Sequence, residues 1–111
     1  MEQKDYTLSK VSWITKMKST PPLTQEYIDL VYLRYRVMIS YLQSHKLTTR
    51  EILDDDINDE FELRKSDLTE KGFEFYKNGI IPWIKKIDRS VDRKKTITDI
   101  SFLDKKLQSI K

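Results

Sequence analysis

The chain has 111 residues and a formal net charge of +3, which is the size of one domain and too small a charge to indicate a nucleic-acid partner by itself. Hydrophobic residues make up 38% and charged residues 35%, so we expect a folded chain rather than a disordered one. The absence of Cys excludes disulfides, thiolate chemistry and cysteine-based zinc sites, and two Gly are too few for a glycine-rich phosphate loop. No apolar run has the length of a signal-peptide core or of a membrane-spanning helix, so we expect a cytoplasmic protein.

The first 23 residues predict a short amphipathic helix followed by a linker. Over positions 6–18 the apolar residues recur at every third position: Leu8, Val11, Ile14 and Met17. Pro21 and Pro22 then end the helix and form the linker.

The next segment predicts the longest helix of the protein. Thr24 is the expected N-cap, and the helix runs to about Ser44. A helical wheel places a narrow polar stripe on it, formed by Asp29, Arg36, Ser40 and Gln43. A second stripe lies within the apolar arc and mixes rings with basic groups: Tyr27, Arg34, Met38, Tyr41 and His45.

Short elements are expected between Lys46 and Glu70. We predict a short helix over Thr49–Leu53, an acidic loop over positions 54–60 and a single extended segment over Phe61–Arg64. Asp67, with Glu70 three residues later, has the spacing of a capping box and would begin the following helix.

The last third of the chain predicts two further helices joined by a basic loop. The first has Phe73, Tyr76 and Ile80 on one face. Gly79 and Pro82 interrupt or kink it, and Pro82–Asp88 is then either a new turn or a continuation that buries Trp83, Ile84 and Ile87. Ser90–Thr96 is the expected loop, and Asp99 is the expected N-cap of a closing helix.

These elements together predict a mainly α, compact bundle of four to five helices with at most a minor short β segment. We expect a single domain over residues 1–111. It would consist of an N-terminal helix with its Pro-Pro linker (1–23), a central part (24–95) and a C-terminal helix (96–111).

The charge is distributed unevenly along the chain. Residues 54–70 hold eight acidic residues against two basic ones, whereas residues 71–95 hold eight basic residues against three acidic ones. Asp54, Asp56 and Asn58 match the first ligand positions of a calcium-binding EF-hand loop, but Asp59 stands where the loop needs Gly and Lys65 stands where it needs Glu. We therefore expect a solvated acidic loop and no metal site.

No catalytic group or cofactor site is predicted. His45 is the only histidine, and its place at a helix end suits the helix dipole without any catalytic role. We expect a protein that is not an enzyme and that binds another protein. Acidic side chains would steer the encounter, and Tyr and Arg side chains, if exposed, would anchor it. The predicted contact residues are Asp54, Asp55, Asp56, Asp59, Glu60, Tyr27, Arg34 and Tyr41.

Basic residues after the acidic loop could instead contact phosphates, with Trp83 and Tyr76 nearby for stacking on bases. The residues concerned are Lys85, Lys86, Arg89, Arg93, Lys94 and Lys95.

Two resemblances accompany these patterns. The stretch from Phe61 to Gly72 (FELRKSDLTEKG) is similar to the C-terminal part of winged-helix regulators, where a wing strand leads into a Leu-Thr-x-x-Gly helix start; this resemblance implies DNA binding. The wider pattern Asp67-Leu-Thr-x-x-Gly-Phe73 with Trp83-x-Lys-Lys-x-Asp88 resembles short uncharacterised bacterial accessory proteins, which implies a bacterial origin and an intact small domain.

The favoured function is therefore non-enzymatic binding to another protein. An immunity-type inhibitor of a bacterial toxin is one concrete form, because an acidic segment could occlude the basic cleft of a nuclease toxin. The alternative is a winged-helix-like, DNA-binding transcriptional regulator.

Overall fold

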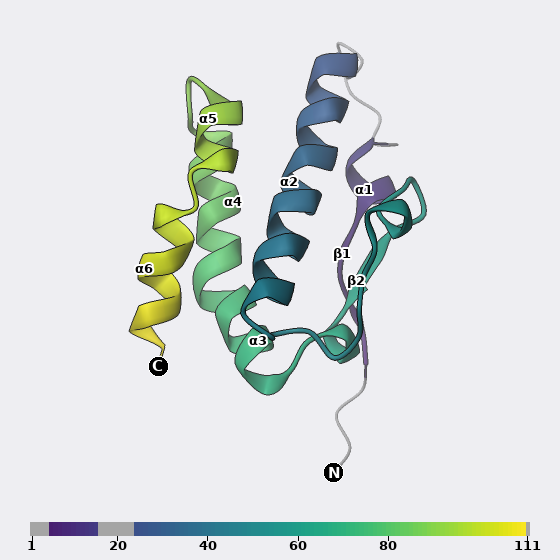
Figure 1. Cartoon of the computed structure of the whole chain (residues 1–111). Coiled ribbons are helices and arrows are strands. Elements are labelled where there is room, and N and C mark those ends of the chain that lie inside the picture. The colour runs from purple at the N-terminus through teal and green to yellow at the C-terminus, as the bar shows by residue number, and fades with distance from the viewer. Residues whose placement is uncertain (1–4, 16–23, 111) are drawn as a thin grey trace.

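The central element is the helix α2 (Gln25–Ser44), which lies between a layer of helices and a small sheet (Figure 1). The structure, a computed structural model, describes residues 5–15 and 24–110. The side-chain oxygen of Thr24 accepts a hydrogen bond from the Tyr27 amide at 3.1 Å, so the predicted N-cap is confirmed. At the other end Lys46 takes a left-handed φ of 59°, and the Leu47 amide bonds the Leu42 carbonyl at 2.9 Å. The chain therefore turns sharply after the helix.

A strand replaces the first part of the predicted N-terminal helix. Residues Thr7–Lys10 form β1, which pairs antiparallel with β2 (Glu62–Arg64), and only Val11–Thr15 form a short helix, α1. The prediction of a helix over 6–18 is wrong for its first part, because pairing with a distant strand outweighs a weak local helical pattern. Met17, Pro21 and Pro22 lie outside the described residues.

The connection from α2 to β2 contains no regular helix of the predicted kind. The expected helix over Thr49–Leu53 is wrong: Thr48 forms an isolated β-bridge with Leu68, and the next turn is a short 3-10 turn, η1 (Asp54–Asp56). The predicted extended segment at Phe61–Arg64 is confirmed by β2. A second 3-10 turn, η2 (Lys65–Asp67), follows β2 directly.

The helix after β2 begins at a different cap from the predicted one. Helix α3 (Glu70–Phe75) has Thr69 as its N-cap, and the Thr69 side chain accepts a hydrogen bond from the Gly72 amide at 3.0 Å. Asp67 is not the cap, because its carboxylate is already bonded to Arg50 and to the Arg64 amide. Gly72 lies so close to the preceding loop that a Cβ there would be 2.2 Å from the Leu47 carbonyl oxygen. A side chain at this position would push the helix away from the loop.

Helix α3 continues through a π-helical turn, η3 (Tyr76–Ile80), into α4 (Ile81–Asp88). The Ile81 amide donates a hydrogen bond to the Tyr76 carbonyl five residues back, and Pro82 has no backbone N–H to donate at this point. Of the two alternatives predicted for Pro82–Asp88, a new turn or a continuation of the preceding helix, the chain therefore adopts the continuation. It buries Trp83 and Ile87 fully and Ile84 in part.

Two helices close the fold where one loop and one helix were predicted. Ser90–Thr96 is not a loop: α5 spans Arg93–Thr98, and the side chain of Asp92 caps it by accepting a hydrogen bond from the Lys95 amide at 3.1 Å. The last helix is α6 (Ser101–Ser109), so the expected single C-terminal helix over 96–111 is divided at Asp99 and Ile100. The boundary drawn at residue 95 thus falls within a helix.

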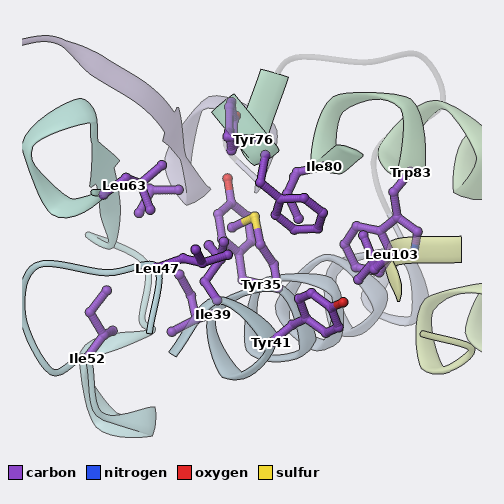
Figure 2. Packing of buried hydrophobic residues seen from close by; sticks show 14 of the residues in the cluster. Tyr35, Ile39, Tyr41, Leu47, Ile52, Leu63, Tyr76, Ile80, Trp83 and Leu103 are labelled. Atoms are coloured by element: carbon purple, nitrogen blue, oxygen red, sulfur yellow. The ribbon is translucent and has the colours of Figure 1, made fainter. Parts of the chain in front are cut away.

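The core forms around α2, where side chains from the helical layer and from the sheet meet (Figure 2). Tyr35 packs edge to face on Phe61 with ring centroids 5.9 Å apart, and Tyr41 stacks on Phe75 at 5.6 Å. The largest fully buried side chains are Trp83, Tyr35, Phe75, Ile39, Leu42, Leu63, Ile80, Ile97, Leu103 and Val11. The predicted fold class, mainly helical with a minor β segment, is confirmed. Across the described ranges, no helix combines the length and apolar character that a membrane crossing requires.

Candidate functional site

The acidic loop of residues 54–60 is on the surface. Its carboxylates, those of Asp54, Asp55, Asp56, Asp59 and Glu60, all belong to exposed residues. Two of the apolar side chains that border or interrupt this run, Ile57 and Phe61, are buried, whereas Leu53 before it is 56% exposed. The loop therefore directs its charges outward while its apolar side chains hold it to the core.

Hydrogen bonds fix the backbone of this loop to α2 and to itself. The Gln43 side-chain amide donates to the Ile52 carbonyl at 2.9 Å and accepts from the Ile52 amide at 2.6 Å. Within the loop the Asp56 carboxylate accepts from the Leu53 amide at 2.9 Å, and the Asn58 side chain accepts from the Glu60 amide at 2.9 Å. A surface held in this way loses little conformational freedom when a partner binds it.

The negative charge of the loop is left largely unneutralised. Among the ion pairs of the described residues, none includes Asp54, Asp55, Asp56 or Asp59. Asp59 accepts a hydrogen bond from the hydroxyl of Tyr32, and the field of Asp56 helps to raise the pKa of Arg50, after the hydrogen bond and charge of Asp67. Within the part of the chain that the structure describes, no group of His, Asp and Glu side chains could hold a metal ion.

The aromatic and arginine stripe of α2 does not extend this acidic surface. Tyr41 is 4% exposed, donates a hydrogen bond to Asp104 at 2.7 Å and belongs to the core. The prediction of Tyr41 as a surface contact is therefore wrong. Tyr27 and Arg34 are half-buried and face α4 and α5, where they border a small gap lined also by Ile87 and Ile97. Helices α4 and α5 lie on one side of α2, whereas β1 and β2 lie on its other side (Figure 1).

Arg34 remains close to aromatic rings in this half-buried position. Its guanidinium carbon is 5.8 Å from the centroid of the Tyr35 ring. The Arg93 guanidinium occupies a similar place over Tyr27, at 5.9 Å. The Arg93 contact joins α5 to α2, whereas Arg34 and Tyr35 are neighbours on α2 itself.

All six predicted phosphate-binding residues (Lys85, Lys86, Arg89, Arg93, Lys94 and Lys95) are exposed. They do not all turn the same way. Arg93 turns toward Tyr27 on α2, whereas the Lys86 ammonium lies 4.8 Å from the Phe102 ring on α6. Lys86 and Lys95 both act on Asp99, whose pKa is lowered first by its hydrogen bonds from Ser101. Trp83 and Tyr76, suggested for base stacking, are buried and cannot stack on bases. Residues 46–61 supply no recognition helix before β2.

His45 is exposed at the C-cap of α2, as its sequence position predicts, and its ring lies 4.4 Å from the Tyr41 ring. The single histidine of the chain thus packs on a core tyrosine at the end of a helix.

None of the surface hollows was predicted, and two of them run beside α2. The larger, of about 1040 Å³, separates the first half of α2 from the turn between α4 and α5, and its lining includes Tyr27, Leu30, Val91 and Arg93. The smaller, of about 460 Å³, is an open trough along the second half of α2. We call it the α2 trough; its lining is Arg36, Val37, Ser40, Tyr41, Ser44, Asp54, Thr98 and Ile100.

The sequence predicts one side of this trough but not the other. The polar stripe predicted for α2 supplies Arg36 and Ser40, and both are exposed. The opposite wall, formed by Thr98 and Ile100, arises from the break between α5 and α6 and has no local signature in the sequence.

Comparison of the chain with protein-family models, with curated proteins and with solved structures finds no match in any of the three.

Proposed function

We propose that this chain is a non-enzymatic binding protein that contacts a basic surface of another protein through its acidic loop. The observation that carries the proposal is the combination of exposure and anchoring in residues 54–60. The carboxylates point outward, whereas Ile57 and Phe61 are buried and Gln43 clamps the preceding backbone. Because such a surface is ordered before binding, the electrostatic attraction is not reduced by the entropic cost of ordering a flexible loop.

One concrete form is an immunity-type inhibitor that occludes the active site of a bacterial toxin. Clefts that bind nucleic acid are basic because they neutralise phosphates, and an anchored row of carboxylates is complementary to them. The acidic loop alone carries this proposal, since Tyr41 is buried and Tyr27 and Arg34 face the helical layer.

DNA-binding regulation is the alternative, and exposure of the basic residues of α4 and α5 is the observation that favours it. The different directions of Arg93 and Lys86 and the lack of a helix suited to the major groove between α2 and β2 disfavour it.

The experiment compares two charge-matched variants for binding to a labelled arginine-rich peptide by fluorescence anisotropy. The test variant is D54N/D55N/D56N, which keeps an acceptor oxygen for the Leu53 amide. The control variant, E70Q/E74Q/D88N, removes the same charge from exposed residues elsewhere. We expect the test variant to bind about tenfold more weakly, and the control to change affinity much less.

Equal weakening of the two variants would mean that only net charge matters and would contradict the proposal. The same titration with a DNA duplex tests the alternative. Duplex binding that falls steeply with salt, and that the D54N/D55N/D56N variant strengthens, would favour the regulator instead.

A further inference from the structure

The α2 trough borders the acidic loop directly. Asp54 belongs both to the loop and to the trough lining, and the Gln43 clamp on Ile52 holds the start of the loop against the second half of α2. A partner that contacts the loop would therefore also cover this trough.

The trough has an apolar strip with polar margins. Val37 is half-buried, and Ile100 on the opposite wall is 44% exposed. Ser40 and Ser44 supply hydroxyls along the floor, and Leu53, next to Asp54, is itself 56% exposed.

Charge complementarity indicates which charges the partner segment carries. The margin formed by Asp54 and continued by Asp55 and Asp56 is acidic, so the partner's polar face is basic along that side. Arg36 is the cation of the lining, at the other end of the α2 stretch that forms the floor, and it would favour a carboxylate there. An elongated strip of apolar surface beside a charged margin is the arrangement that accepts an amphipathic helix.

We propose that the α2 trough receives an amphipathic helix of the partner protein, with its apolar face on Val37 and Ile100 and its basic edge along Asp54. This inference rests on the proposed function, because the same acidic loop supplies the attraction. It adds that recognition depends on the shape and apolar character of the partner and not only on its positive charge.

The test uses two labelled probes of identical composition: a leucine-lysine peptide patterned as an amphipathic helix and a scrambled version. An arginine-rich peptide serves as the third probe. The intact protein should bind the amphipathic peptide about tenfold more tightly than the scrambled one. Replacement of the exposed Ser40 in Ser40→Trp fills the trough and should abolish this preference, whereas Gln108→Trp, on exposed surface of α6, should leave it unchanged.

Ile100→Ser is the second variant and tests the apolar contact without filling the trough. It should weaken binding of the amphipathic peptide severalfold and leave binding of the arginine-rich peptide unchanged. Equal affinity for the patterned and scrambled peptides, or no effect of Ser40→Trp, would overturn the trough inference while the acidic loop still bound the arginine-rich peptide. Failure to bind any of the three probes would overturn the proposed function itself.

Discussion

Asp67 connects its own turn to the end of β2 and to the loop after α2. It is 7% exposed; one of its oxygens accepts a hydrogen bond from Arg50 Nε at 2.8 Å, and the other accepts from the Arg64 amide at 2.9 Å. Arg50 belongs to the loop after α2, and Arg64 ends β2. The carboxylate therefore holds the sheet to the loop at the point where α3 approaches.

Replacing Asp67 should destabilise the protein more than replacing Arg50. Asp67→Ala leaves the Arg64 amide without its acceptor, and we expect it to lower the free energy of unfolding by about 1–3 kcal/mol. Arg50→Ala removes a side chain that is 48% exposed, so it should cost less than about 1 kcal/mol. Urea unfolding of both variants measures the difference. A larger loss for Arg50→Ala would show that the ion pair, and not the bond to the backbone, holds this junction.

At the scale of single elements, Gln43 determines how firmly the acidic loop is held. Its side chain satisfies both backbone groups of Ile52. Gln43→Ala should lower the free energy of unfolding by about 1–2 kcal/mol and speed hydrogen exchange at Ile52 and its neighbours. Ser40→Ala, three residues earlier on the exposed face, is the control. Unchanged exchange at Ile52 in Gln43→Ala would mean that burial of Ile52 and Ile57 alone orders the loop.

The elements that could be predicted are those whose signals are local. Helix α2 has its cap at Thr24 and a long apolar pattern, and β2 alternates apolar and charged residues within a few positions. Helix α5 also has a local signal, because Asp92 is spaced to cap it at Lys95 and Ile97 is apolar. The consecutive basic residues 93–95 favoured the prediction of a loop instead. Local signals suffice where an element's own hydrogen bonds and caps stabilise it.

The remaining elements depend on contacts between distant residues. Strand β1 forms because it pairs with β2, and a bond such as that from Thr7 to Glu62 joins residues 55 positions apart. Thr69 replaces Asp67 as a cap because Arg50 and Arg64 occupy the Asp67 carboxylate. Exposure of the acidic loop was predictable from its composition. Burial of Tyr41 was not, because almost every side of α2 is apolar and packing decides which side is covered.

At the scale of the whole molecule, charge is separated across α2. The acidic loop lies beside the sheet, and the basic residues of α4 and α5 lie on the opposite side (Figure 1). The net charge of +3 therefore does not reveal that the acidic residues are concentrated on one side of the molecule. Such a separation orients the protein toward a charged partner during encounter, and salt weakens the effect.

The core responds to alkaline pH as one unit, because it contains three buried tyrosines, Tyr35 and Tyr41 on α2 and Tyr76 on η3. Burial is the first cause that raises the pKa of Tyr35, Tyr41 and Tyr76 above the ordinary value, and the hydrogen bond to Asp104 raises that of Tyr41 further. A raised pKa means that the folded state holds these protons more tightly than the unfolded state does. The stabilisation is complete below the unfolded pKa of about 10 and is lost as the pH rises above it.

We therefore expect the free energy of unfolding to fall above about pH 10, by up to about 1.4 kcal/mol per pH unit for each buried tyrosine. Tyrosinate absorbance should show these three ionising together with unfolding. Tyr41→Phe removes one ionising hydroxyl, so the free energy of unfolding should fall less steeply with pH, by the contribution of one proton. The variant also loses the hydrogen bond to Asp104, which lowers its stability at neutral pH. Ionisation of Tyr35, Tyr41 and Tyr76 near pH 10 in a protein that stays folded would contradict the burial of their hydroxyls, since a phenolate inside the core would be largely removed from water.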